Sequence, residues 1–190
     1  MPADVYRGAA DALYTGYNAD RDRGLRITIK AGTGNNIDPS FYYGLALPLD
    51  TGASDYEWNI QNCNTTVLRF GQLLTAEPGN MVGPTLQGIE DLIAQDPQAY
   101  WDTANNRVAS SMNPSPRVKL VPVFDPKFYA DGKKNGRNAD LKAANFIGVF
   151  IEGISSGDVI ARITPVTGIY DGNAGPAPAG AFPRAIRLVQ

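Results

Sequence analysis

Several short stretches of this chain alternate apolar and polar residues, a pattern that predicts β-strands. Residues 25–30, Leu-Arg-Ile-Thr-Ile-Lys, have the period-two pattern of a half-buried strand. Residues 41–47 give a second candidate strand that ends at Pro48, and residues 66–70 give a weaker third. The first third of the chain is therefore predicted to supply strands to a sheet.

The second half of the chain has the clearest strand pattern. Residues 145–152 are apolar on both faces, which indicates a central strand that is covered on both sides. Residues 158–164 follow after a turn that contains Gly and Ser, so the two segments predict a hairpin. Residues 117–124 are also apolar, and Pro122 favours an edge position because proline donates no ladder hydrogen bond. We expect these residues to be buried together: Val121, Val123, Phe146, Val149, Phe150, Ile151, Ile160 and Ile163.

Two other segments have apolar residues at helical spacing. Residues 84–95 place leucine and isoleucine on one face, with Pro84 suited to the first position of a helix. A shorter helix is predicted over 55–62, because Ser54 and Glu57 have the spacing of a capping box. Residues 96–101 are expected to add one more helical turn after the longer helix.

Glycine and proline divide the chain into short elements. The sequence has 20 Gly and 14 Pro in 190 residues, well above the roughly 12% of ordinary proteins. The whole chain, 1–190, is predicted to be a single compact α+β domain, mostly β, with an antiparallel or mixed sheet and two or three short helices. Residues 1–24 are interpreted as an N-terminal extension, 171–183 as a Gly/Pro/Ala-rich surface loop, and 184–189 as a final strand.

Composition excludes several function classes. With 17 basic and 19 acidic residues the net charge is −2, so no field favours nucleic acid, and we expect none as a partner. The chain contains no histidine and a single cysteine, Cys63. Histidine-based hydrolysis and zinc or iron–sulfur sites that need several Cys or His ligands are therefore excluded. Residues 35–38 and 171–173 could supply oxygen ligands to calcium, but both lack the ligand pattern of a calcium loop and are interpreted as turns, so we expect no cofactor and no metal.

Carboxylates are the remaining candidates for catalysis, but none is placed to act. Asp55 and Glu57 fall in the first turn of a predicted helix, where negative charge is favoured by the exposed N–H groups. Glu152 has two interpretations. It is either the partner of Arg162 across the predicted hairpin or a catalytic acid in a cleft. We predict no catalytic residue and a non-enzymatic protein.

Aromatic and basic side chains are the candidates for contacts with a partner. The aromatic residues could be buried, form a protein-contact face or form a platform that stacks against a sugar. The basic residues fall between 127 and 142, where aspartates dilute their charge, so we interpret this stretch as a solvated loop or, less simply, as a site for an anionic partner. The candidate contact residues are Tyr42, Tyr43, Trp58, Trp101, Lys133, Lys134 and Arg137.

A long motif at 77–97, EPGNMVGPTLQGIEDLIAQDP, resembles the C-terminal region of TadG-like proteins of the TadE/TadG family, which are associated with tight-adherence (Flp-type) pilus assembly in bacteria. The segments RITIKAG, DPSFYYGLALP, DYEWNIQNCN, SPRVKLVPVFDP, NFIGVFIEG and RAIRLVQ are similar to family segments in the same order. Agreement of several separated segments in one order is more specific than agreement of one motif.

The resemblance implies a biological setting. Family members have an N-terminal membrane helix and an extracytoplasmic domain, so we expect this domain outside the cytoplasm, in a polypeptide that extends upstream of Met1 to a membrane anchor. Cys63 would then have its disulfide partner in that upstream part or be a lone buried thiol. The expected partners are other pilus-assembly or cell-surface proteins, or a second copy of the chain. A glycan-binding module is the alternative, and a carboxylate hydrolase is a third.

Overall fold

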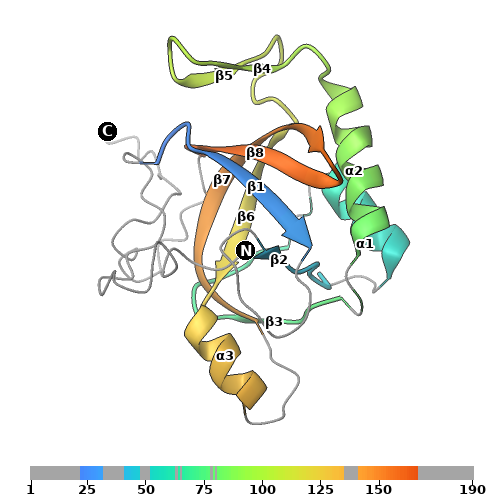
Figure 1. Ribbon diagram of the computed structural model, residues 1–190, viewed down its shortest axis with the longest axis vertical. Coiled ribbons are helices and arrows are strands. Elements are labelled where there is room, and N and C mark those ends of the chain that lie inside the picture. The colour runs from blue at the N-terminus through green and yellow to red at the C-terminus, as the bar shows by residue number, and fades with distance from the viewer. Residues whose placement is uncertain are drawn as a thin grey trace, which may run out of the picture.

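The computed structural model describes residues 22–31, 41–47, 52–62, 64, 66–77, 79, 81–134 and 141–166. Within them the chain forms an α+β domain with a mainly antiparallel sheet, three helices and a separate hairpin (Figure 1), which confirms the predicted fold class. The predicted loop at 171–183, the predicted strand at 184–189 and nearly all of the 1–24 extension lie outside the described residues. No described helix is both long and apolar enough to span a bilayer.

The sheet has the strand order β2-β1-β8-β7-β3, with β6 paired to β7 as well. Its strands are β1 (Arg26–Ala31), β2 (Phe41–Tyr42), β3 (Leu73–Leu74), β6 (Val118–Phe124), β7 (Leu141–Ser155) and β8 (Asp158–Thr164). Only β1 and β2 pair in parallel; the other pairings between the described strands are antiparallel. The long strand β7 pairs with β3, β6 and β8, and it is therefore the central strand of the sheet.

The predicted hairpin is confirmed as β7 and β8, joined by a two-residue turn. Ser156 and Gly157 occupy it with φ values of 53° and 81°, a left-handed conformation that suits glycine. Residues 148–150 pair with both β6 and β8, so this part of β7 is central, as its apolar sequence predicts. Strand β6 pairs with no described strand other than β7, which agrees with the edge position expected from Pro122.

The expected core residues are buried, but they do not form one cluster. Seven of the eight are at most 7% exposed, and Val121 is partly buried. Val123, Val149 and Ile163 pack beneath helix α2 (Val82–Gln95) on one face of the sheet. Phe150 points to the opposite face, and Phe146 belongs to a third cluster with Phe124 and Tyr129. Alternation along β7 puts Phe150 on the face opposite Val149, because successive residues point to opposite faces, and Phe146 lies four residues earlier on the same face as Phe150.

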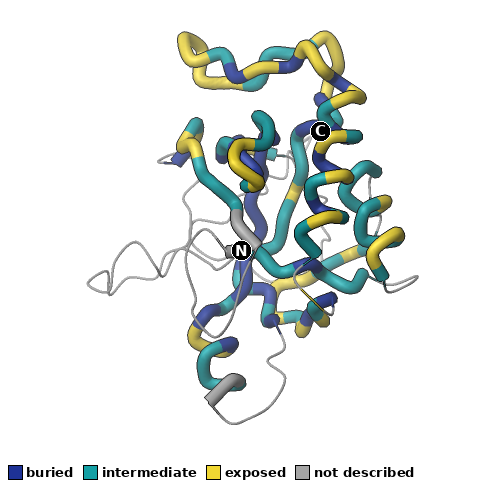
Figure 2. The backbone as a smooth tube through the Cα atoms, turned by 45° about the vertical axis from the view of Figure 1, so that its right-hand side comes forward, coloured by how far each residue is buried: buried dark blue, intermediate teal, exposed yellow. Residues whose placement is uncertain are grey.

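Helices α1 (Ala53–Gln61) and α2 occur where the sequence predicts helices, with different starting points. The N-cap of α1 is Gly52, and no side chain caps it, so the capping box expected from Ser54 does not form. Helix α2 begins at Val82, two residues before Pro84. The two helices pack together beside the sheet, and exposed residues recur along their outer sides (Figures 1 and 2).

Two local predictions are wrong. Residues 66–70 are not a strand, because the chain turns at Gly71 (φ 76°) and the strand, β3, follows the turn. Residues 96–101 do not extend α2. They lead into β4 (Tyr100–Asp102), which pairs with β5 (Arg107–Ala109) in a hairpin that the sequence pattern did not predict. Burial of Trp101 against Phe150 favours the strand over a helical turn.

The basic stretch is also more ordered than predicted. Residues that we expected in a solvated loop form helix α3 (Pro126–Lys134). The backbone N–H of Phe128 donates to Asp125 Oδ1 at 3.0 Å, and Pro126 occupies the first helical position. An aspartate followed by proline is a helix-start signal, since it caps a free N–H and needs no N–H at the next residue. This signal identifies the helix in the sequence.

A methyl group at Gly148 is expected to destabilise the sheet. A Cβ at this position would lie 2.2 Å from the backbone oxygen of Thr164 and 2.5 Å from Val166 Cγ1. Because the nearer atom belongs to a paired strand, Gly148→Ala should lower the free energy of unfolding by about 1–3 kcal/mol. Urea denaturation measures the loss. The matched control is Gly153→Ala, where a Cβ would meet no atom within 4 Å; equal losses in the two variants would contradict the close approach.

Candidate functional site

Among the charged residues that the structure describes, Arg117 makes the most hydrogen bonds through its side chain. It is only 4% exposed. Its guanidinium donates to four backbone carbonyls, those of Asp96, Ala99, Ile151 and Glu152, at 2.8 to 3.1 Å. Burial lowers its pKa, and nearby Asp96 and Glu152 oppose that shift. Arg117 therefore connects the chain after α2 with the bulged part of β7, a structural role.

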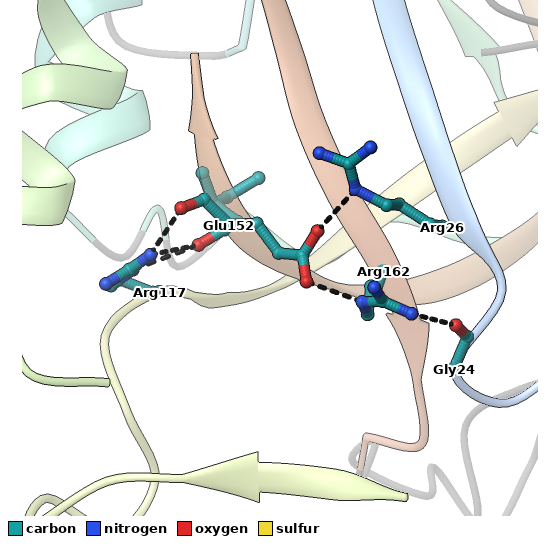
Figure 3. A network of polar contacts seen from close by, with 6 residues as sticks. Gly24, Arg26, Arg117, Glu152 and Arg162 are labelled. Atoms are coloured by element: carbon teal, nitrogen blue, oxygen red, sulfur yellow. Dashed lines mark hydrogen bonds and ion pairs between the residues drawn. The ribbon is translucent and has the colours of Figure 1, made fainter. Parts of the chain in front are cut away.

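Glu152 lies at the centre of an ion-pair network, with its carboxylate between two arginines from neighbouring strands (Figure 3). Arg162 Nε donates to Oε1, and Arg26 Nε donates to Oε2 at 2.9 Å. The terminal nitrogen of Arg162 also donates to the carbonyl of Gly24 at 2.9 Å. The cross-strand pairing of Glu152 with Arg162 is confirmed, and both carboxylate oxygens are engaged in contacts that join β1, β7 and β8.

Asp96 is a second buried charge, 3% exposed, placed just after α2. The hydroxyls of Ser110 and Ser115 each donate to its Oδ2 at 2.6 Å. These two hydrogen bonds are the main reason that the pKa of Asp96 is lowered, with the positive charge of Arg117 as a smaller contribution. The carboxylate thus fixes the loop that follows the β4–β5 hairpin.

The stability that Asp96 contributes is expected to depend on pH. Its pKa is lower in the folded protein than in the unfolded chain, so its contribution is complete above the ordinary aspartate pKa of about 3.9 and is lost as the pH falls through the folded pKa. Urea midpoints of the wild type and Asp96→Asn should differ at pH 7 and converge below about pH 4. The exposed Glu90→Gln serves as a control that should follow the wild type throughout. A difference for Asp96→Asn that stays constant over this range would contradict the assignment.

Tyr56 and Thr85 form a half-buried polar contact between α1 and α2. Thr85 Oγ1 donates to Met81 O at 2.7 Å and lies 3.0 Å from Tyr56 Oη, so the tyrosine is the donor in that pair. Burial raises the pKa of Tyr56, which keeps its hydroxyl protonated at neutral pH. Glu77, 5% exposed, accepts at 3.4 Å from Gly52 N, and its Oε2 has no hydrogen-bond partner among the described residues.

The predicted contact residues are not brought together. Trp101 is 8% exposed and packs against Phe150, so its ring is covered. Tyr43 is partly buried against Phe124 and Tyr129, and burial raises the pKa of both Tyr43 and Tyr42. Trp58 is 54% exposed on α1. Of the predicted aromatics, only Trp58 presents a mainly exposed ring.

The predicted basic contacts are only partly described. Lys133 and Lys134 occupy the last residues of α3, and Arg137 lies outside the described residues. Cys63 is also outside them. Within the described part of the chain, no three carboxylate or cysteine side chains gather in a way that could hold a metal.

Exposed apolar residues occur where β3 and α3 meet the start of β7, and we call this group the β3–α3 surface. Leu73 is 56% exposed and pairs with Lys142 across the strands. Lys142 Nζ lies 5.5 Å from the centre of the Phe128 ring, which is 38% exposed. Phe70, 42% exposed, lies against the buried ring of Phe146. The sequence pattern does not reveal this surface, because it predicts residues 66–70 as a strand.

A cleft of about 380 Å³ lies on the other side of the molecule, at the base of the β4–β5 hairpin. The loop after β5 and the end of β8 complete it. The cleft has mixed polar and apolar walls. Its lining residues are Arg107, Val108, Ser110, Met112, Asn113, Pro114, Ser115, Val118, Thr164 and Pro165.

No family model, curated protein or solved structure matches this chain. What this protein can bind or catalyse is therefore inferred from the chemistry of the described residues alone. The buried charges Arg117 and Asp96 and the partly buried Glu152 each make hydrogen bonds within the fold. Among the residues that the structure describes, the β3–α3 surface and the cleft beneath the hairpin are two features open to a partner.

Proposed function

We propose that this chain is a non-enzymatic, extracytoplasmic domain of a pilus-assembly-associated or surface-attachment protein, and that it acts through protein–protein contacts. The β3–α3 surface is the observation that carries the proposal, since apolar side chains that gather on a surface mark contact sites. Leu73 and Phe128 supply apolar area there, and Lys142 adds a positive charge between them. The ordered resemblance to TadG-like proteins supports the biological setting.

The engagement of Glu152 also favours a binding role over hydrolysis. A general acid or base needs a carboxyl group that can exchange a proton with a substrate. Both oxygens of Glu152 accept from arginines of the same sheet. The glycan-binding alternative requires exposed rings in one groove, and the described tryptophans lie on separate elements, with Trp101 buried.

Site-specific photo-crosslinking in the native bacterium tests the proposal. A benzophenone side chain at Phe128 or Leu73 of the full-length protein is expected to capture a pilus-assembly protein, another surface protein or a second copy of the chain. The control position is Tyr100, which is 62% exposed on the hairpin at the opposite end of the molecule (Figure 1). Mass spectrometry identifies the adducts. Equal capture at Tyr100, or recovery of the protein from the cytosol, would contradict the proposal.

A further inference from the structure

We infer that the cleft beneath the β4–β5 hairpin binds a carboxylate group carried on a short apolar body. The inference concerns the cleft alone and holds whether or not the β3–α3 surface contacts a protein. The cleft volume of about 380 Å³ falls at the lower end of the range for small-ligand sites, roughly 300–1,000 Å³. This volume suits a ligand no larger than one or two amino acid residues.

Thr164 supplies a buried hydrogen-bonding group to the cleft. It is 6% exposed, and it lines the cleft at the end of β8. Ile163 belongs to the core beneath α2, so the alternation of side chains along β8 turns Thr164 to the opposite face, where the cleft lies. A hydroxyl on the wall of the cleft can donate a hydrogen bond to a ligand oxygen.

Arg107 makes the cleft attractive to an anion. It is the only charged residue among the described residues that line the cleft, and its side chain is 66% exposed. Its single described contact is long, 4.0 Å from Nε to Asp102 Oδ2, which leaves the terminal N–H groups available. Both oxygens of Asp102 already accept from Asn105. Because a planar guanidinium matches a carboxylate well, a carboxylate is the anion that this geometry fits.

The other walls of the cleft fit the apolar body of such a ligand. Val108 and Val118 line one part and are partly buried around Trp101 and Phe150. Met112, 47% exposed, lies at the opening, and its flexible thioether can adapt to different apolar groups. Ser110 and Ser115 already donate to Asp96. Their hydroxyl protons are committed, so Asn113 and Thr164 are the neutral donors that remain.

Binding of N-acetyl-leucine to the isotopically labelled protein, followed by NMR, tests the inference. We expect shifts at the backbone amides of Val108, Ser110 and Thr164, and at least about tenfold weaker binding of the neutral N-acetyl-leucinamide, the loss expected for one charge-assisted hydrogen bond. A tripeptide with a C-terminal leucine identifies the source of the carboxylate. Tighter binding of the tripeptide supports a chain terminus, and equal or weaker binding supports a small acid.

Single substitutions test the contributions of Arg107 and Thr164 separately. Arg107→Gln and Thr164→Val should each weaken binding of N-acetyl-leucine about tenfold, whereas Thr164→Ser should restore it because the hydroxyl remains. Arg69→Gln is the control, since Arg69 is exposed and does not line the cleft. Equal binding of the acid and the amide, no shifts at the three amides, or unchanged affinity in Arg107→Gln would each overturn the inference.

Discussion

Replacing Arg117 by alanine is expected to lower the free energy of unfolding by about 3–5 kcal/mol, the cost of removing one member of a buried charged network. Four backbone carbonyls would lose their donor, and two of them, of Asp96 and Ala99, come from the segment after α2. The other two lie at the bulge of β7, where the register with β8 shifts. Without these hydrogen bonds, the segment after α2 should detach from the sheet. That segment and the bulged part of β7 should both become less stable.

Two further variants make this expectation specific to the guanidinium. Arg117→Lys keeps the charge, but a single ammonium cannot donate to carbonyls on both sides, so we expect an intermediate loss. Arg69→Ala removes an exposed arginine and should change stability by less than about 0.5 kcal/mol. Chemical denaturation measures all three. An Arg117→Ala midpoint equal to that of Arg69→Ala would show that the buried network contributes nothing.

The parts of the fold that the sequence predicts correctly are those determined by local patterns. Residues 145–152 are apolar at every position up to Glu152 except for Asn145 and Gly148, and such a segment is stable only when both faces are covered. The hairpin that it forms with 158–164 then places Glu152 near Arg162, so that ion pair is predictable too. Arg26 could not be included, because it joins through the pairing of β1 with β8, a contact between segments far apart in the chain.

The buried network around Arg117 was not predictable, for the same reason. An arginine at the start of a strand is usually exposed, and nothing nearby in sequence indicates burial. Its acceptors lie 18 to 35 residues away and come together only in the folded sheet. Asp96 shows a related limit. The sequence correctly predicts that it ends a helix, but its two serine donors follow 14 and 19 residues later.

The cleft is harder still to predict, because loops and the β4–β5 hairpin form most of it. The hairpin turn places Asn106 at φ 50°, a conformation that asparagine tolerates, but no Asn-Gly or Asp-Gly pair marks it in the sequence. The β3–α3 surface had one usable signal, the Asp125-Pro126 helix start. Recognition of that signal would have placed Phe128 on a helix instead of in a solvated loop.

Replacing Phe150 by alanine should also be costly, by about 3–5 kcal/mol, because the side chain is fully buried on the face of the sheet opposite α2. Its ring centre lies 6.5 Å from that of Trp101, and the Arg117 guanidinium carbon lies 5.0 Å above it. The cavity left by the Phe150 ring cannot collapse easily. The β4–β5 hairpin holds Trp101 in place, and the backbone carbonyls that accept from Arg117 hold its guanidinium. Thermal and urea denaturation measure the loss.

Phe128→Ala is the matched control for Phe150→Ala, because it removes the same ring from a site that is 38% exposed on α3. It should cost much less, about 1 kcal/mol or below. The double variant Phe150→Ala, Arg117→Ala should lose less than the sum of the single losses, since each side chain supports the other across the same space. If Phe150→Ala melts at the wild-type temperature, β7 is not the central strand and the sheet assignment is wrong. If the two losses simply add, the cation and the ring stabilise the fold independently.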